Sequence, residues 1–453
     1  MPEEKKQSEL TRRQIEILSL LRKGLTNQEI ARSLCISQNT VKVHLANIYK
    51  ILDVTNRTEA SSIQAPHALA KNKVQLLFCD LPKFETQANA RHFYLTLIKD
   101  LNQFDLFNVQ VEKENLPSAS TDFFVNATYS EGEEPTLFFS LHHVCSPEIL
   151  WYASYAFVAG KDLQLEASRL AIRLWVQLEL ASARLYKKDS SMQPSWWYAT
   201  SYYRVKGEGR TKEIWLEAKE ALEAISKSSE EHIYVSFALV DFHYKALLEQ
   251  WCALKDYQAR IQELAAHGMR FRPNSQYSMF IIALSNILAG SNEGAAFYLE
   301  KIIVVNPLNS SARHLLAQMY MLLSKEELGL EQLSEYQNLY PASREQPYIQ
   351  AIKALLFCLA KRFDECIQHC ADVLFIIPET TVTRLVMISA LGWTSQLELS
   401  QKHIDLFYHY HPNFKLADLG NMTGAMHVDK RNLLLEGISR TSMKIQPVRV
   451  IDK

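Results

Sequence analysis

The stretch SQNTVKVHLANIYKIL, residues 37–52, combines a helix-capping serine, an apolar stripe and an edge without acids. The apolar residues of the stripe recur at helical spacing and are Val41, Leu45, Ile48 and Leu52. Such spacing is typical of a helix that buries one face. We expect the stripe to pack against the preceding segment, on Ile30, Ala31 and Leu34.

Each capping residue in this region lies between two apolar residues that can close a hydrophobic staple. The sets are Leu10, Thr11 and Ile15, then Leu25, Thr26 and Ile30, then Ile36, Ser37 and Val41. Gln14 and Glu29 add capping-box partners to the first two caps. Gly24 ends the first helix, and Cys35 and Ile36 leave only a short turn before the third. The pattern predicts a helix-turn-helix.

The edge opposite the stripe has the residue types of a DNA-reading helix. Its residues are Asn39, Lys42, Val43, Ala46 and Lys50, and no acid follows before Asp53. Acids would be repelled by phosphates, whereas lysine supplies charge and asparagine supplies an amide suited to base edges. On charge alone, an amphipathic helix with a merely solvated face fits these residues equally well.

Composition indicates a globular protein of two to four domains. The chain has 453 residues, of which 47% are hydrophobic and 22% charged. Residues 1–73 carry a net charge of +5, against −1 for the whole chain, a mild indication of nucleic acid at the N-terminus. Neither an apolar run of membrane-spanning length nor a signal peptide is recognised, and the seven cysteines follow no disulfide pattern. We therefore expect a cytoplasmic protein.

Residues 10–60 closely resemble the LuxR/GerE-type DNA-binding domain. The matching residues are Leu10, Thr11, Glu16, Leu18, Leu21, Gly24, Asn27, Glu29, Ile30, Ala31, Leu34, Ile36, Ser37, Thr40, Val41, Lys42, His44, Asn47, Ile48, Tyr49, Leu52, Val54, Asn56, Arg57, Glu59 and Ala60.

The resemblance implies how this domain meets DNA. The third helix enters the major groove, with Lys42 and Val43 at base-contacting positions and Thr40 and Asn47 near the backbone. A fourth helix, from about Arg57, pairs two copies on a two-fold site. This sequence departs from the family where Gln28 replaces a frequent phosphate-binding lysine, Ala46 a polar base reader and Ile51 a basic residue. Fewer cationic contacts predict a shallow salt dependence.

Residues 74–158 read as a small αβ module. We expect a strand from Val74, a helix over 88–105, extended pieces over 107–113, 121–130 and 136–144, and a hairpin through residues 145–148 into 149–157. This order resembles the TolB-like module found behind the DNA-binding heads of some bacterial regulators.

Prolines recur at positions 273, 307, 341, 378 and 412 in the C-terminal region. Their spacing of 34 to 37 residues is typical of tetratricopeptide repeats, in which a proline ends each second helix. The same frame places small residues where paired helices touch, at Ala283, Ala295, Ala317, Gly329, Ala354 and Cys366. In the outer units Glu249, Ile261, Ile388 and Ser400 take these positions, so the frame degrades there. Such solenoids typically hold proteins or peptides.

The sequence gives little support for a metal site or a catalytic site. His142 and His143 are strand neighbours that face opposite ways, and Cys358, Cys366, His369 and Cys370 fit a tight helix contact better than a zinc site. No phosphate-binding GxxxxGK[ST] loop, HExxH or GxSxG motif occurs. We expect no catalytic residues, cofactor or metal, and no receiver domain before the head.

The sequence therefore predicts a mainly α, multidomain transcription regulator. Its predicted divisions are a disordered segment 1–9, the DNA-binding domain 10–66, the αβ module 74–158, degenerate helical repeats 159–275, tetratricopeptide-like repeats 276–440 and a tail 441–453. The residues expected at DNA are Asn27, Gln28, Asn39, Thr40, Lys42, Val43, Ala46, Asn47 and Lys50. Expected partners are double-stranded promoter DNA, a second copy on DNA, a protein or peptide on the solenoid and RNA polymerase. The alternative is an interaction scaffold with a weak or vestigial DNA-binding head.

Overall fold

The computed structural model describes most of the chain outside its termini. The described residues are 14, 17, 20–21, 25–33, 36–52, 54, 56–57, 59, 73–79, 87–112, 121–207, 211–228, 232–248, 251–341, 346–412, 414 and 427–443. The predicted segment 1–9, the staple at Leu10, Thr11 and Ile15, and most of the predicted tail lie outside them. Two compact units are present, and each is treated separately.

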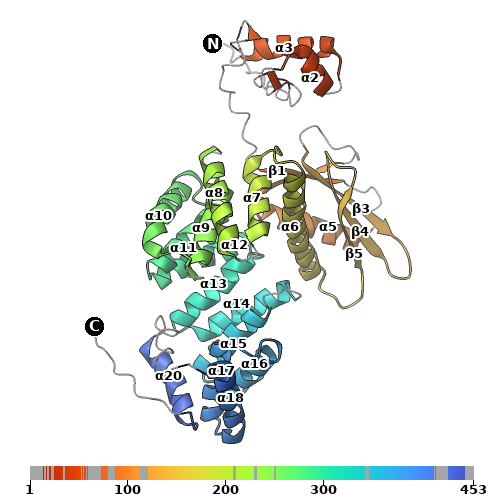
Figure 1. The fold of residues 1–453 in the computed structure, drawn as a ribbon. Coiled ribbons are helices and arrows are strands. Elements are labelled where there is room, and N and C mark those ends of the chain that lie inside the picture. Colours follow the sequence, from red (N-terminus) through yellow and green to blue (C-terminus); the bar gives the residue numbers. More distant parts are fainter. Residues whose placement is uncertain are drawn as a thin grey trace, which may run out of the picture. The chain divides into compact units, whose positions relative to one another are not determined.

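The first unit is formed by Met1–Arg91, Asp105–Lys161 and Leu185–Tyr198. It begins with the helices α2 (Asn27–Ser33) and α3 (Gln38–Leu52), preceded by helical residues at Gln14, Ile17, Leu20 and Leu21 (Figure 1). The small core of these helices consists of Ile17, Leu21, Ile30, Ala31, Val41, Leu45 and Ile48. The predicted helix-turn-helix is confirmed. The side chains of Leu34 and Leu52, also expected in this core, lie outside the described residues.

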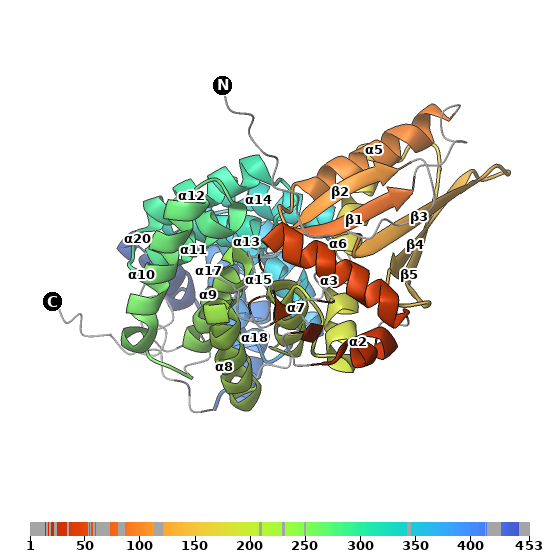
Figure 2. The same ribbon diagram turned by 90° about the horizontal axis from the view of Figure 1, so that it is seen from above.

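A five-stranded mixed sheet completes the first unit, with strand order β2-β1-β3-β4-β5. Its strands are β1 (Val74–Cys79), β2 (Phe107–Glu112), β3 (Phe123–Ser130), β4 (Thr136–His143) and β5 (Ile149–Ala156). Figure 2 shows β1 between β2 and β3, with which it pairs in parallel, whereas β3, β4 and β5 pair antiparallel. The predicted hairpin around residues 145–148 is confirmed as the β4–β5 turn.

One face of this sheet is held by aromatic contacts within the unit. The rings of Phe123 and His143 lie 4.9 Å apart, and His143 Nε2 shares a 2.9 Å hydrogen bond with the hydroxyl of Tyr198. Trp197 meets the ring of Phe107 edge-on at 5.6 Å. Both Trp197 and Tyr198 begin α7 (Ser195–Gly207). The buried histidine therefore has a structural partner on this face.

The second unit is helical and consists of His92–Phe104, Asp162–Arg184 and Ala199–Lys453. It contains most of α5 (Ala88–Asn102) and α6 (Leu163–Lys188), then α8 (Lys212–Ser228), α9 (Ile233–Leu248) and α10 (Leu254–Phe271). Ser168 of α6 donates a 2.6 Å hydrogen bond to Asp100 of α5, and Phe104 stacks on Trp175. The hydroxyl of Tyr277 donates to the Phe104 carbonyl. These contacts join α5 and α6 to the repeats.

Four helix pairs follow with the predicted period. They are α11 (Gln276–Leu288) with α12 (Asn292–Val305), α13 (Ser310–Leu322) with α14 (Glu326–Leu339), α15 (Gln346–Leu359) with α16 (Phe363–Ile376), and α17 (Thr381–Trp393) with α18 (Leu397–Tyr410). Each proline of the series lies two residues beyond the end of α10, α12, α14, α16 or α18. The tetratricopeptide-like period is confirmed.

The small residues of the repeats lie at helix contacts, as predicted. A Cβ added to Gly329 would lie 3.2 Å from the carbonyl oxygen of Ala317, so the two helices approach closely there. Ala283, Ala295, Ala354 and Cys366 are fully buried. Ile388 and Ser400 are also buried at the equivalent positions, so the last pair forms with other side chains.

The turn within each pair contains a left-handed residue. These residues are Gly290, Ser324, Lys361 and Ser395, with φ between 57° and 75°. Glycine adopts this conformation without steric cost, whereas serine and lysine do not. The four turns share one geometry although only one of them has the residue that the geometry favours.

The helix α20 (Val428–Ser439) lies across α17 and α15. The indole of Trp393 donates a 3.1 Å hydrogen bond to the Leu433 carbonyl, and Lys430 pairs with Glu326 at 2.5 Å. A Cβ on Gly392 would lie 1.9 Å from the carbonyl oxygen of Gly437. Glycines are therefore needed where α17 and α20 cross. No helix within the described residues is both long and apolar enough to span a bilayer.

Gly392→Ala is expected to push α20 away from α17, because the new methyl would meet main chain that cannot rotate aside. Overpacking of this kind costs about 1–3 kcal/mol. Thermal unfolding of the full chain should show a lowered midpoint. Gly132→Ala is the control, since nothing lies within 4 Å of its added Cβ. Equal midpoints for the two variants would show that the crossing is looser than described.

A buried histidine makes the stability of α8–α10 depend on pH. The ring of His243 is fully buried and stacks on Tyr257 at 4.1 Å, and neither ring nitrogen has a hydrogen-bond partner among the described residues. Burial, and then the positive charges of Lys219 and Arg260, lower the pKa of His243 to about 4. The unfolded chain binds this proton near pH 6.5. This contribution to stability is thus complete above pH 6.5 and is lost as the pH falls toward 4.

His243→Phe should flatten the fall in the free energy of unfolding between pH 6.5 and pH 4. The difference between variant and wild type should reach up to about 3 kcal/mol at pH 4. Denaturant titrations at several pH values measure it. His92→Gln, at an exposed histidine, is the control. An unchanged pH slope in His243→Phe would mean that the ring is protonated in the folded state.

Candidate nucleic-acid interface

Reciprocal hydrogen bonds fix the start of α2. The amide of Thr26 donates to Glu29 Oε2 at 2.7 Å, and the amide of Glu29 donates to Thr26 Oγ1 at 3.3 Å. The bonds from the Thr26 amide and hydroxyl lower the pKa of Glu29. This is the capping box predicted from the sequence, and such caps stabilise a helix by about 1 kcal/mol. The equivalent partner Gln14 is helical and buried, but its cap Thr11 is outside the described residues.

The start of α3 is fixed by Ser37. Its Oγ accepts a 3.0 Å hydrogen bond from the Thr40 amide and shares a 2.8 Å bond with the Thr40 hydroxyl. The side chains of Val41, Leu45 and Ile48 are buried on Ile30 and its neighbours. Burial of each such side chain contributes about 1.5–3 kcal/mol. The rotation of α3 about its own axis is thereby set.

This rotation places the predicted DNA-contacting residues of α3 in solvent. The exposed residues are Asn39, Thr40, Lys42, Val43, Ala46, Asn47 and Lys50. Val43 is 61% exposed, so an apolar side chain lies on the same surface as the polar ones. The face is also free of acids throughout α3. An uncovered surface of basic, amide and small apolar side chains results.

Two further residues that were predicted to contact DNA lie at the start of α2. Gln28 is exposed, whereas Asn27 is half-buried because Arg57 holds it. Arg57 Nη1 donates to Asn27 Oδ1 at 3.1 Å, and Arg57 Nη2 donates to the Leu25 carbonyl. The Oδ1 atom of Asn27 is thus occupied. Its Nδ2 group is the donor that remains for an external partner.

Arg57 belongs to the beginning of the predicted fourth helix. Asn56 and Glu59 bond each other reciprocally, through Asn56 Nδ2 to Glu59 Oε1 at 2.8 Å and the Glu59 amide to Asn56 Oδ1 at 2.9 Å. Arg57 and Glu59 are helical, and the rest of the predicted helix lies outside the described residues. The contact from Arg57 to Asn27 spans 30 residues, so no local sequence signal announces it.

The histidine and cysteine groups considered as metal ligands have structural contacts instead. Cys366 and Cys370 are buried with their sulfurs 4.0 Å apart, while the ring of His369 stacks on Phe357 and shares a bond with Gln350. His142 stacks on Phe124, on the opposite sheet face from His143. Among the described residues, no group of three or more histidine, cysteine or acidic side chains is arranged to hold a metal.

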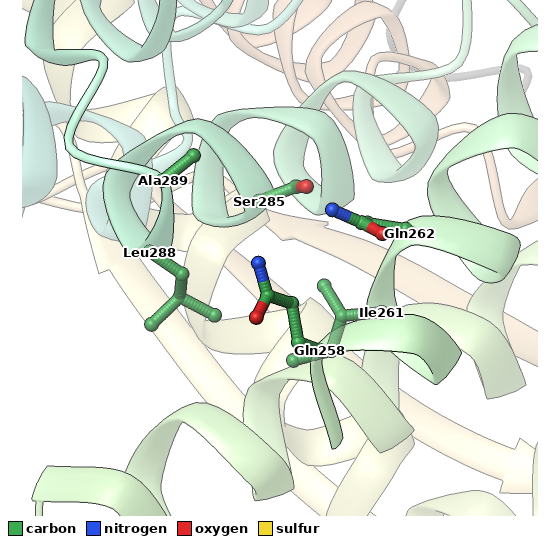
Figure 3. Close-up of a pocket in the computed structure, with 6 residues that line it drawn as sticks. All are labelled: Gln258, Ile261, Gln262, Ser285, Leu288 and Ala289. Carbon is green, nitrogen blue, oxygen red and sulfur yellow. The ribbon is translucent and has the colours of Figure 1, made fainter. Parts of the chain in front are cut away.

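A small hollow between α10 and α11 is lined by Gln258, Ile261, Gln262, Ser285, Leu288 and Ala289 (Figure 3). It accepts about one water molecule. Pockets for small organic ligands are usually some 300 Å³ or more. The hollow is therefore too small to hold such a ligand.

Comparisons with known proteins concern mainly the N-terminal helices. Residues 8–63 match the model of bacterial regulatory proteins of the luxR family. The CsgBAC operon transcriptional regulatory protein of Escherichia coli (strain K12) is 60% identical over 53 residues, which are 12% of this chain and 24% of that protein. The transcriptional regulatory protein LiaR of Bacillus subtilis (strain 168) is 50% identical over 52 residues, 12% of this chain and 25% of that protein.

The chain thus matches about a quarter of the length of these curated relatives. Among solved structures, the APC/C hetero-tetramer Cut9-Hcn1 aligns with 61% of this chain and 48% of its own, at 12% identity and a TM-score of 0.42. The resemblance of residues 74–158 to the TolB-like module stays a prediction. The exposed face on α3 and the matched segment coincide, and residues 8–63 form a luxR-type helix-turn-helix domain of the kind found in transcriptional regulators.

Proposed function

We propose that the protein is a sequence-specific DNA-binding transcription regulator. The exposed, acid-free face of α3 carries this proposal, because its residue types match the chemistry of base edges and phosphates. In this proposal α3 enters the major groove, where Lys42 and Val43 meet bases and Thr40, Asn47 and Lys50 lie near the backbone. The repeats hold a protein or peptide partner, with RNA polymerase as one candidate.

The apolar part of this face points to the bases that it prefers. Val43 and Ala46 are exposed on the same side of α3 as Lys42. Apolar side chains contact the methyl group of thymine, and lysine donates to the O6 and N7 atoms of guanine. We therefore expect operator half-sites in which guanine and thymine lie next to each other. A two-fold arrangement of half-sites follows if the fourth helix pairs two copies, as the family resemblance implies.

Lys42→Ala is expected to weaken binding to a selected duplex by about 1–3 kcal/mol, or roughly tenfold or more, because a base contact is lost. Genomic fragments enriched by the full-length protein supply the duplex, and fluorescence anisotropy compares it with a scrambled sequence. Binding to the scrambled duplex should change much less. Lys212→Ala, at an exposed lysine outside the head, is the charge-matched control. Unchanged affinity for the selected duplex in Lys42→Ala would show that the recognition-helix assignment is wrong. A wild-type protein that binds neither duplex would favour the scaffold alternative.

Asn27→Asp distinguishes the hydrogen bond of this side chain with Arg57 from its proposed contact with DNA phosphate. The carboxylate still accepts from Arg57, so the melting temperature should stay equal or rise. The Nδ2 donor is replaced by a negatively charged oxygen, so affinity should fall several-fold for selected and scrambled duplexes alike. Asn27→Ala, which loses both interactions, should lower melting temperature and affinity together. If Asn27→Asp binds DNA normally, the N-terminus of α2 does not touch phosphate.

A further inference from the structure

Arg57 is attached to the start of α2 at two points. Its Nη1 donates a 3.1 Å hydrogen bond to Asn27 Oδ1, and its Nη2 donates to the carbonyl of Leu25. Both hydrogen bonds are partly buried. The guanidinium group is planar and rigid, so bonds from its two terminal nitrogens fix its orientation as well as its position. Arg57 therefore has one defined geometry relative to the first turn of α2.

The backbone on both sides of Arg57 is also held in place. The amide of Val54 donates a 2.9 Å hydrogen bond to the Tyr49 carbonyl in the last turn of α3, and the side chain of Val54 packs against the core of the head. On the other side, Asn56 and Glu59 form reciprocal hydrogen bonds. The guanidinium group thus extends from a fixed segment of main chain.

The chemistry of arginine decides which end of the Asn27 amide remains for a ligand. Arginine has only donors, whereas the asparagine side chain has an acceptor oxygen at one end and a donor nitrogen at the other. Only the oxygen of Asn27 can bond with Arg57, so the Nδ2 group is excluded from that position. Without this bond the amide is free to turn over and present its oxygen, which an anion repels. Arg57 thus keeps the donor end of the amide available.

Asn27 is also more ordered than its neighbour before any ligand arrives. The side chain of Asn27 is half-buried, whereas that of Gln28 is exposed. A side chain that must be immobilised on binding weakens binding by the entropy that it loses. Part of this cost for Asn27 is already met by its bond with Arg57. Amide donors are among the groups that bind the phosphate oxygens of nucleic acids.

We propose that Arg57 is a positioning residue for DNA binding, which holds Asn27 with its Nδ2 group ready to donate to a backbone phosphate. Arg57 itself does not form that contact, because two of its nitrogens already donate within the chain and its side chain is half-buried. The inference rests on the proposed function, since it concerns a contact of the same DNA-binding surface. It has a specific consequence, because the effect of Arg57 on DNA affinity passes through Asn27 alone.

A double-mutant cycle in the full chain tests this consequence by fluorescence anisotropy on the selected and the scrambled duplex. Arg57→Gln should weaken binding to both duplexes by about three- to tenfold, because the Asn27 amide must then be ordered on binding. The same change should have no effect in an Asn27→Ala background, since residues that act through one another are not additive. Arg32→Gln is the matched control, because it removes an exposed arginine from the same domain. Any effect of Arg32→Gln should be equal in both backgrounds.

Two results would overturn the positioning role while wild type binds DNA. One is wild-type affinity in Arg57→Gln, and the other is an equal loss in the Asn27→Ala background, which would mean that Arg57 acts on DNA directly. A purely structural role would lower the melting temperature without changing the affinity of the folded protein. Circular dichroism melting confirms that each variant is folded at the assay temperature. If Arg57→Gln is not, Arg57→Lys replaces it in the same cycle, since lysine cannot form both hydrogen bonds in the arginine geometry.

Failure of the DNA proposal gives a different result. Wild type would then bind neither duplex, and the positioning role would fall with the proposed function. A wild-type protein that binds both duplexes, together with Arg57 variants that do not differ from it, rejects the role of Arg57 alone.

Discussion

The burial of Val41, Leu45 and Ile48 is the constraint on which the proposed reading face depends. A helix turns about 100° per residue, so fixing three residues toward the core leaves no freedom for the others. Asn39, Lys42, Val43 and Lys50 must then point outward whatever their own preferences are. Each buried side chain contributes about 1.5–3 kcal/mol, far more than the solvation of a lysine varies with helix rotation. The core, and not the polar residues, therefore determines which face of α3 is exposed to solvent.

The few charges on the exposed face of α3 favour discrimination between DNA sequences over strong non-specific attraction to phosphate. The face of α3 carries two lysines, and the exposed Gln28 takes a position where the family often has a third cation. Attraction to phosphate supplies most of the non-specific affinity of DNA-binding proteins. A helix with only two lysines adds little to this attraction, so contacts with bases would account for more of any preference between sequences.

Features with a local or periodic cause could be predicted from the sequence. The caps at Thr26 and Ser37, the strands and the proline period all follow from neighbours within a few residues or from the repeat itself. The bond from Arg57 to Asn27 and the Gly392–Gly437 crossing join distant segments, and nothing in their flanking sequence marks them. The left-handed turns within the helix pairs could not be predicted from the sequence for another reason. Ser324, Lys361 and Ser395 are not the residues that such turns favour, so tertiary packing overrides local preference there.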